Sequence, residues 1–221
     1  NYYARNASTD QKSIVYHSGG DIYVLDIKTG KNNKIPISYK SGHVNKSRKF
    51  ADTGTYLENV SLNKNSKIIN IISRGKSFSM GNWSGPAIQH GMLQGVRYRH
   101  MLNLTDDNKI LLSSDFKNRN NLEIHSLASN KLLKRYDHNL GRILSVKKSP
   151  INDLIAFSNH KHQLHIFDIK KGKGVNIAHS SNHPIQFNWS PDGKFIAYSI
   201  SKTSRCSIIK IYDIKLEKSF E

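Results

Sequence analysis

The stretch Ser190-Pro-Asp-Gly-Lys-Phe-Ile-Ala-Tyr-Ser199 contains the pattern that decides the fold. A polar turn, whose Asp and Gly suit a tight reversal of the backbone, leads directly into a short apolar strand. Similar turns begin at residues 63, 105, 149 and 190, so successive copies are 42, 44 and 41 residues apart. The strands that follow them are expected over 68–72, 110–114, 154–158 and 195–199. A repeat of this length indicates stacked copies of one supersecondary unit.

A second repeated element is a strand that ends in an apolar residue followed by Asp-Ile. It occurs as Gln163-Leu-His-Ile-Phe-Asp168-Ile169, and related strands end at Asp26, Ser126 and Asp213. We expect each Asp to accept hydrogen bonds from backbone N–H groups of the turn that follows it. Fourth strands are expected over 34–38 and 174–178. One repeat therefore contains four strands in about 43 residues, which is typical of a β-propeller blade.

The sequence thus predicts an all-β fold, and no segment shows a sustained helical period. Residues 1–221 are expected to form a single β-propeller fragment with a polar insertion at 40–57. Its four-stranded blades are predicted over 1–39, 58–91, 97–139, 141–180 and 182–221. Because closed propellers have four to eight blades, these five are expected to belong to an incomplete six- or seven-bladed ring.

The chain is strongly basic, with 34 Lys+Arg against 16 Asp+Glu and a formal net charge of +18 among 221 residues. These basic residues are scattered rather than gathered in one helix, which favours a solvated surface over a nucleic-acid site. A site for a polyanion or an acidic partner is the alternative. No apolar segment reaches the roughly 18 residues of a membrane-spanning helix.

Cysteine content and the start of the chain narrow the classes further. The single cysteine, Cys206, excludes a disulfide framework and a cysteine-cluster zinc site. The chain begins at Asn1 with neither Met nor a signal-peptide pattern, so we expect a segment of a longer protein. The sequence also lacks a Gly-x-Ser-x-Gly nucleophile elbow and a Gly-rich phosphate loop. We therefore expect no catalytic residue and no cofactor in this chain.

Several segments occur in the order seen in one family of large enzymes. The most particular of them are Ser73-Arg-Gly-Lys-Ser-Phe78, Val96-Arg-Tyr-Arg99 and Asn159-His-Lys-His-Gln-Leu164. Together with the turn and strand repeats they resemble the propeller region of Tricorn-type proteases, which are self-compartmentalising serine peptidases. The resemblance covers nearly the whole chain.

This resemblance implies that the chain itself catalyses no reaction. Propellers of the family are thought to gate peptides on their way to and from a catalytic part that this chain lacks. It also implies a cytoplasmic location, peptides and the remaining domains of the parent as partners, and a homo-oligomeric parent. No membrane or nucleic-acid partner is expected. A free-standing protein-interaction propeller and a TolB-like periplasmic propeller are the alternatives.

Four arginines in or near these segments are candidates for the wall of a substrate channel. They are Arg74, Arg97, Arg99 and Arg142. Guanidinium groups in such a channel can hold peptide carboxylates through paired hydrogen bonds. The alternative is that they pair with acids such as Glu58, Asp106 or Asp115, or cap a strand.

Two histidines, His160 and His162, are further channel candidates. On a strand, their spacing would point both side chains the same way, as a metal or acid–base site requires. No cysteine or carboxylate pair nearby completes a ligand set, so no metal is expected. The favoured interpretation is a polar hairpin between the second and third strands of a blade.

Overall fold

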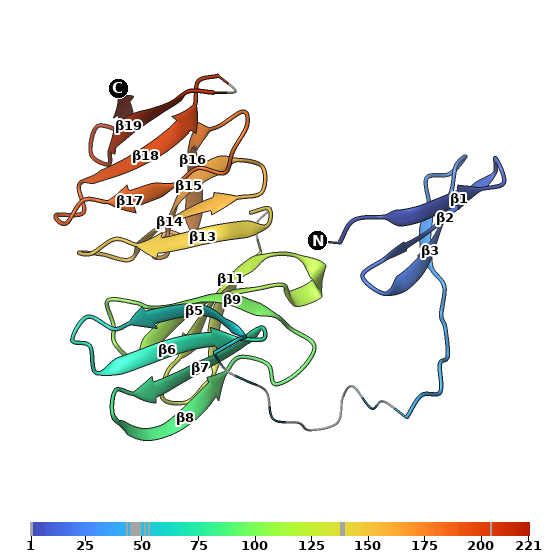
Figure 1. Cartoon of the computed structure of the whole chain (residues 1–221), viewed down its shortest axis with the longest axis horizontal. Coiled ribbons are helices and arrows are strands. Elements are labelled where there is room, and N and C mark those ends of the chain that lie inside the picture. Colours follow the sequence, from blue (N-terminus) through green and yellow to red (C-terminus); the bar gives the residue numbers. More distant parts are fainter. Residues whose placement is uncertain are drawn as a thin grey trace. The chain divides into compact units, whose positions relative to one another are not determined.

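The computed structural model describes residues 2–42, 44, 50, 52, 54–137, 140–203 and 205–221. In this part of the chain the strands form five four-stranded antiparallel sheets. Strands lie in sequence order within every sheet, so each sheet is a meander of the kind found in propeller blades (Figure 1). A short 3-10 helix, η2 (Phe116–Asn118), lies between two strands of the third sheet. The all-β propeller fold predicted from the repeats is confirmed.

Each blade spans one sequence repeat. The first contains β1 (Arg5–Thr9), β2 (Ser13–Ser18), β3 (Asp21–Asp26) and β4 (Asn32–Lys34). The second contains β5 (Leu57–Leu62), β6 (Ile68–Ser73), β7 (Lys76–Gly81) and β8 (Ser84–His90). The third contains β9 (Tyr98–Asn103), β10 (Lys109–Ser114), β11 (Asn121–Ser126) and β12 (Leu132–Tyr136). The fourth contains β13 (Ile143–Lys148), β14 (Leu154–Asn159), β15 (Gln163–Asp168) and β16 (Lys173–His179). The fifth contains β17 (Phe187–Trp189), β18 (Phe195–Ser201), β19 (Ser207–Asp213) and β20 (Lys218–Phe220).

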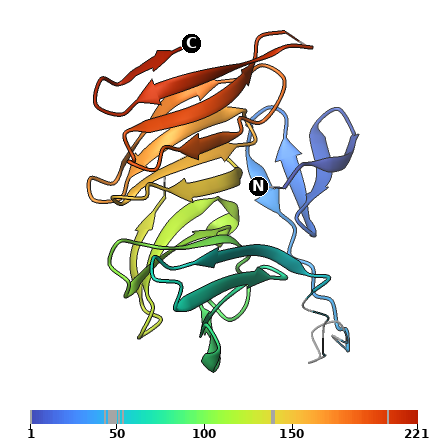
Figure 2. The ribbon, with the colours of Figure 1, turned by 60° about the vertical axis from the view of Figure 1, so that its left-hand side comes forward.

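The chain divides into two compact units, an N-terminal unit of residues 1–52 and a C-terminal unit of residues 53–221. The N-terminal unit holds the first blade, and none of its described residues is buried. All residues of the apolar core belong to the C-terminal unit, whose four blades are stacked on one another (Figure 2). That residues 1–221 form a single propeller fragment with the bounds given above therefore remains a prediction.

Apolar clusters between successive blades hold the C-terminal unit together. One cluster joins the third and fourth blades, where Tyr136 packs edge-on against Phe167 at a ring-centroid distance of 4.9 Å. Another joins the fourth and fifth blades around Trp189, whose indole Nε1 donates to the carbonyl of Lys147 at 3.1 Å. Because the blades bury each other's faces, all six residues of β11 are buried.

The Asp residues that end the third strands act as predicted. Asp26 Oδ1 accepts from the backbone N–H of Thr29 at 2.7 Å, and Asp168 Oδ1 from that of Lys171 at 3.0 Å. Asp213 Oδ1 accepts from Lys215 N at 2.8 Å and from Leu216 N at 2.9 Å. These bonds fix the turns into the fourth strands.

The predicted strands over 68–72, 110–114, 154–158, 174–178 and 195–199 are confirmed. The strand predicted over 34–38 is wrong, because β4 ends at Lys34. Ile35 N still donates to Ile22 O at 2.8 Å, but in this register residues 37 and 38 would lie opposite Gly20 and Gly19, which belong to the turn before β3.

Removing a central core side chain should destabilise the chain strongly. Phe157 is fully buried between blades, so Phe157→Ala is expected to cost about 3–5 kcal/mol of unfolding free energy. Ile209 is 71% exposed, so Ile209→Ala should cost about 0.5 kcal/mol or less. Denaturant unfolding of both variants measures the difference, and equal costs would contradict the placement of the core.

Candidate functional site

The first strands of the four blades in the C-terminal unit lie side by side. β9 contacts both β5 and β13, and β13 also contacts β17. Ser61 Oγ donates to the carbonyl of Met101 at 2.7 Å, and His100 Nε2 donates to that of Leu144 at 3.2 Å. Together with the Trp189–Lys147 bond, these hydrogen bonds join residues near the start of one first strand to residues near the start of the next. Residues near the end of one strand are likewise joined to residues near the end of the next. The four first strands therefore run in the same direction and start at one end.

Arginines gather at this end, which we call the arginine end. Second strands run antiparallel to first strands, so the turns between second and third strands also lie there. Six of the seven arginines between residues 54 and 221 occupy these turns or the starts of first strands, namely Arg74, Arg97, Arg99, Arg119, Arg142 and Arg205. Turns at the opposite end contain seven lysines and no arginine. The planar donors suited to carboxylates are thus confined to one end.

The turn between β6 and β7 meets the start of β9 at the arginine end. Gly75 has a φ of +71°, and a Cβ there would lie 2.6 Å from Arg97 Cγ, so only glycine fits against the Arg97 stem. Its carbonyl accepts from Tyr98 N at 2.9 Å. Beside it, the Arg74 guanidinium lies 5.0 Å from the centroid of the Tyr56 ring. Tyr56, Arg74, Gly75 and Arg97 are among the residues that border a hollow of about 360 Å³.

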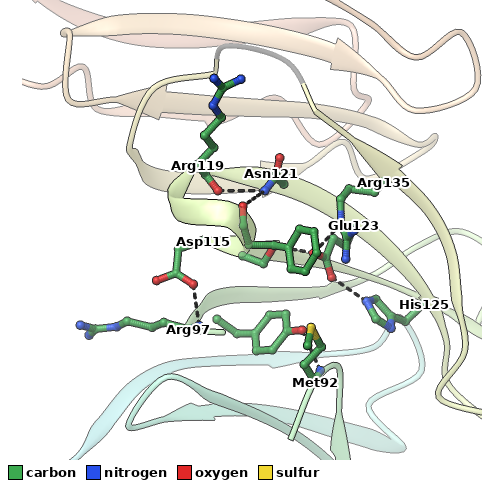
Figure 3. A network of polar contacts seen from close by, with 11 residues as sticks. Met92, Arg97, Asp115, Arg119, Asn121, Glu123, His125 and Arg135 are labelled. Carbon is green, nitrogen blue, oxygen red and sulfur yellow. Dashed lines mark hydrogen bonds and ion pairs between the residues drawn. The ribbon is translucent and has the colours of Figure 1, made fainter. Parts of the chain in front are cut away.

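Arg97 is already paired with an acid. Its Nη2 lies 3.2 and 3.1 Å from the two carboxylate oxygens of Glu58. Its backbone N donates to Asp115 Oδ1 at 2.7 Å (Figure 3). For Arg97, the structure therefore shows the alternative interpretation, in which the arginine pairs with an acid of the chain itself. Asp106 instead pairs with Lys109 at 2.8 Å, away from the candidate arginines.

Arg99 and Arg142 differ from Arg97, because no carboxylate of the described residues forms an ion pair with either. Burial, followed by the charges of Arg97 and Arg142, lowers the pKa of the Arg99 guanidinium. Arg142 Nε is buried and has no hydrogen-bond partner in the described part of the chain. The structure thus brings Arg97, Arg99 and Arg142 together where the third and fourth blades meet.

The histidine candidates lie in the turn between β14 and β15, as the favoured hairpin interpretation predicts. His160 Nδ1 accepts from Arg142 N at 2.8 Å, and His160 N donates to Arg142 O at 2.9 Å. Burial lowers the pKa of His160, which favours the neutral imidazole. His162 has a φ of +57° in the same turn, so the strand alternation assumed for this pair is wrong. No group of three potential metal ligands occurs among the residues that the structure describes.

A buried carboxylate that sequence reasoning missed lies next to the arginine end. Glu123 on β11 is 1% exposed and accepts from Ser114 Oγ at 2.5 Å, His125 Nε2 at 2.8 Å and Arg135 Nε at 3.0 Å (Figure 3). Burial by itself raises the pKa of Glu123. The hydrogen bonds from His125 and Ser114 and the Arg135 charge outweigh burial, so the pKa lies below its ordinary value.

Comparison with known proteins now assigns this arrangement to a family. Residues 57–221 match the family model described as the Tricorn protease second beta propeller domain. The chain belongs to this Tricorn propeller family. A Tricorn protease homolog from Saccharolobus solfataricus is 31% identical over 214 residues, which are 96% of this chain and 19% of that protein. The Tricorn protease of Thermoplasma volcanium is 30% identical over 230 residues, which are 100% of this chain and 21% of that protein.

Solved structures show the same fold. A crystal structure of the tricorn protease superposes with a TM-score of 0.67 at 24% identity, over 99% of this chain and 21% of that one. TolB from Acinetobacter baumannii superposes with a TM-score of 0.59 at 16% identity, over 95% of this chain and 51% of that one. The Tricorn propeller chain thus spans about a fifth of the length of the Tricorn relatives that it matches. Its described residues include no helix long and apolar enough to cross a membrane.

In this Tricorn propeller the Glu123 network supports the loop that carries Arg119. Arg135 stacks on Phe116 with its Cζ 3.7 Å from the ring centroid, and Asn121 Nδ2 donates to the carbonyls of Phe116 and Arg119 at 2.9 and 2.8 Å. One sequence signal could have revealed the network. His125 occupies a third-strand position at which the matching strands have Leu25, Phe167 and Tyr212.

Neutralising the buried carboxylate of the Tricorn propeller should destabilise it. Glu123→Gln leaves Arg135 without its ion-pair partner, so we expect a loss of about 3 kcal/mol at pH 7. Because the pKa of Glu123 is lower in the folded chain, its contribution is complete above the ordinary carboxyl pKa of about 4.3 and disappears as the pH falls through the folded value.

Guanidinium unfolding at pH 7 and at pH 3 measures this effect. The difference between the wild-type chain and Glu123→Gln should narrow at pH 3. Glu217→Gln, at an exposed turn position, is the matched control and should change stability by about 0.5 kcal/mol or less at either pH. A Glu123→Gln difference that is independent of pH would contradict the assigned ionised state.

Proposed function

We propose that this chain is a non-catalytic propeller segment of a Tricorn-like self-compartmentalising serine protease. In this proposal the segment gates or channels peptides toward a catalytic domain elsewhere in the parent protein. The single observation that carries the proposal is the arginine end, since it places anion-binding groups where four first strands start together. In a propeller, the blades surround a central channel, and the first strands are the ones that face it.

The relation to longer proteins supports a division of labour. The chain spans about a fifth of relatives that are named Tricorn proteases. We therefore place the catalytic residues in other domains of the parent and take those domains and peptides as the partners of this segment. The proposal includes a homo-oligomeric parent in the cytoplasm.

Peptide cross-linking to the full 221-residue chain tests this function. A hexapeptide that carries a central photoreactive benzophenone should label residues at the starts of β5, β9 and β13, and mass spectrometry should recover the unlabelled peptide intact. Labelling confined to the lysine turns of the opposite end would contradict channelling. Hydrolysis that survives further purification and is abolished by substitution of one Ser would contradict the non-catalytic role.

We further infer that the first blade belongs to a different propeller from the other four. The family match to a second propeller begins at residue 57, after β4, and the compact C-terminal unit begins at residue 53. A blade inside a ring is covered on both faces, as the fully buried β11 is, whereas no described residue of the N-terminal unit is buried. Its natural neighbours would then be blades that precede it in the parent.

Hydrogen exchange on the full chain checks the independence of the first blade. Because β2 and β3 lack buried residues, their amides should exchange much faster than those of β14 and β15. Phe157→Ala should accelerate exchange in β14 and β15 and leave β2 and β3 unchanged. Equal protection in the wild-type chain, with a common response to this substitution, would indicate one cooperative unit instead.

A further inference from the structure

The cations of the arginine end divide into those with partners and those without. Arg97 is paired with Glu58, Arg74 lies over the Tyr56 ring, and Lys76 Nζ donates to the carbonyl of Leu93. Among the described residues, Arg99 and Arg142 have neither an ion pair nor a ring beneath the guanidinium. Arg119 and Arg205 also lack both, but they are exposed. Arg99 and Arg142 are therefore the two half-buried arginines of this end without a direct partner among the described residues.

These two arginines come from neighbouring first strands. The hydrogen bond between His100 Nε2 and Leu144 O sets the register of β9 against β13, and it places Arg99 beside the start of β13, which Arg142 precedes by one residue. Both side chains are half-buried, so water screens their mutual repulsion less than it would on an open surface. Two like charges held close together in this way lower the stability of the folded chain.

The two nearby acids, Glu58 and Asp115, offset part of the Arg99 charge but form no ion pair with Arg99 or Arg142 among the described residues. Glu58 uses both of its carboxylate oxygens for Arg97, and Asp115 Oδ1 accepts from the backbone of Arg97. The adjacent imidazole of His160 is also occupied, because its Nδ1 accepts from the backbone N of Arg142. A pair of guanidinium groups without an ion-pair partner among the described residues is suited to an acceptor supplied by a ligand.

We propose that Arg99 and Arg142 form a carboxylate-binding site at the arginine end, which holds the terminal or side-chain carboxylate of a peptide. This assignment rests on the proposed peptide-handling function and adds to it a ligand group and two residues. Each guanidinium presents a planar pair of N–H donors, and two of them can bind both oxygens of one carboxylate. The buried Nε of Arg142, which lacks a partner among the described residues, is the donor with most to gain.

Titration of the full 221-residue chain with one peptide in two forms tests the assignment. The probes are tetra-alanine with a free C-terminal carboxylate and tetra-alanine with a C-terminal amide, both N-acetylated. We expect the carboxylate form to bind about tenfold more tightly, since one charge-assisted interaction is at stake. Arg99→Gln and Arg142→Gln should each remove this preference and leave binding of the amide form unchanged.

Two further variants serve as controls. One is expected to have no effect, and the other to raise the affinity for the carboxylate form. Lys171→Ala removes an exposed cation at the opposite end and should leave the preference unchanged. Glu58→Gln removes the acid closest to the site and should raise the affinity for the carboxylate form about twofold. Circular dichroism of every variant shows which ones are folded, and either Arg99→Gln or Arg142→Gln is sufficient for the test.

The outcomes separate this site from the function on which it rests. Equal binding of both peptide forms, unaffected by Arg99→Gln and Arg142→Gln, would overturn the site and leave peptide handling intact. Orthophosphate that displaces the peptide at a lower concentration than acetate would overturn the carboxylate assignment in favour of a phosphate site. Absence of binding for both peptide forms would overturn the site together with the proposed function.

Discussion

Each blade of this chain can bury its two faces only against other blades, and the remaining structure depends on this constraint. A four-stranded meander leaves apolar side chains on both faces, and in the C-terminal unit successive blades cover them around Phe157, Phe167 and Trp189. Where no blade follows within the described residues, the face stays open, as at Ile209, which is 71% exposed. Stacking also aligns the first strands, which is why residues more than 40 positions apart, such as Glu58 and Arg142, start strands at the same end.

Because the first strands are aligned, the basic residues that are scattered in the sequence fall at two different ends of the blades. Arginines lie at one end and lysines occupy the turns at the other. At the lysine end, acids such as Asp168 and Asp213 hold backbone N–H groups of the turns, so they are tied to the blade architecture. At the arginine end Glu58 is paired with Arg97. Arg99 and Arg142 have no such partner among the described residues, and they lie where the first strands begin.

The parts of the fold that depend on local chemistry could be predicted from the sequence. The turn at Ser190 and the strand that follows it are encoded within ten residues, and so are their repeats. The end of β4 was missed because it depends on where the partner strand β3 begins, which the local sequence around residues 34–38 does not contain. At the site, the sequence supplied the arginines but not their partners. The pairing of Arg97 with Glu58, and the burial of Glu123 by side chains from β10 and β12, depend on contacts between segments that only the folded chain brings together.

The third blade, which contains Arg99, also contains a buried charge with a structural role, that of Glu123. Glu123 receives donors from Ser114, His125 and Arg135, so all of its charge is compensated within the fold, and the fold gains stability from it. Arg99 and Arg142 are partly withdrawn from water and form no ion pair among the described residues, and Arg142 keeps a buried Nε with no partner there. A glutamine or an apolar side chain at either position would avoid the repulsion. Two half-buried guanidinium groups side by side lower the stability of the fold, and a ligand that brings its own negative charge to the start of β13 would offset this repulsion.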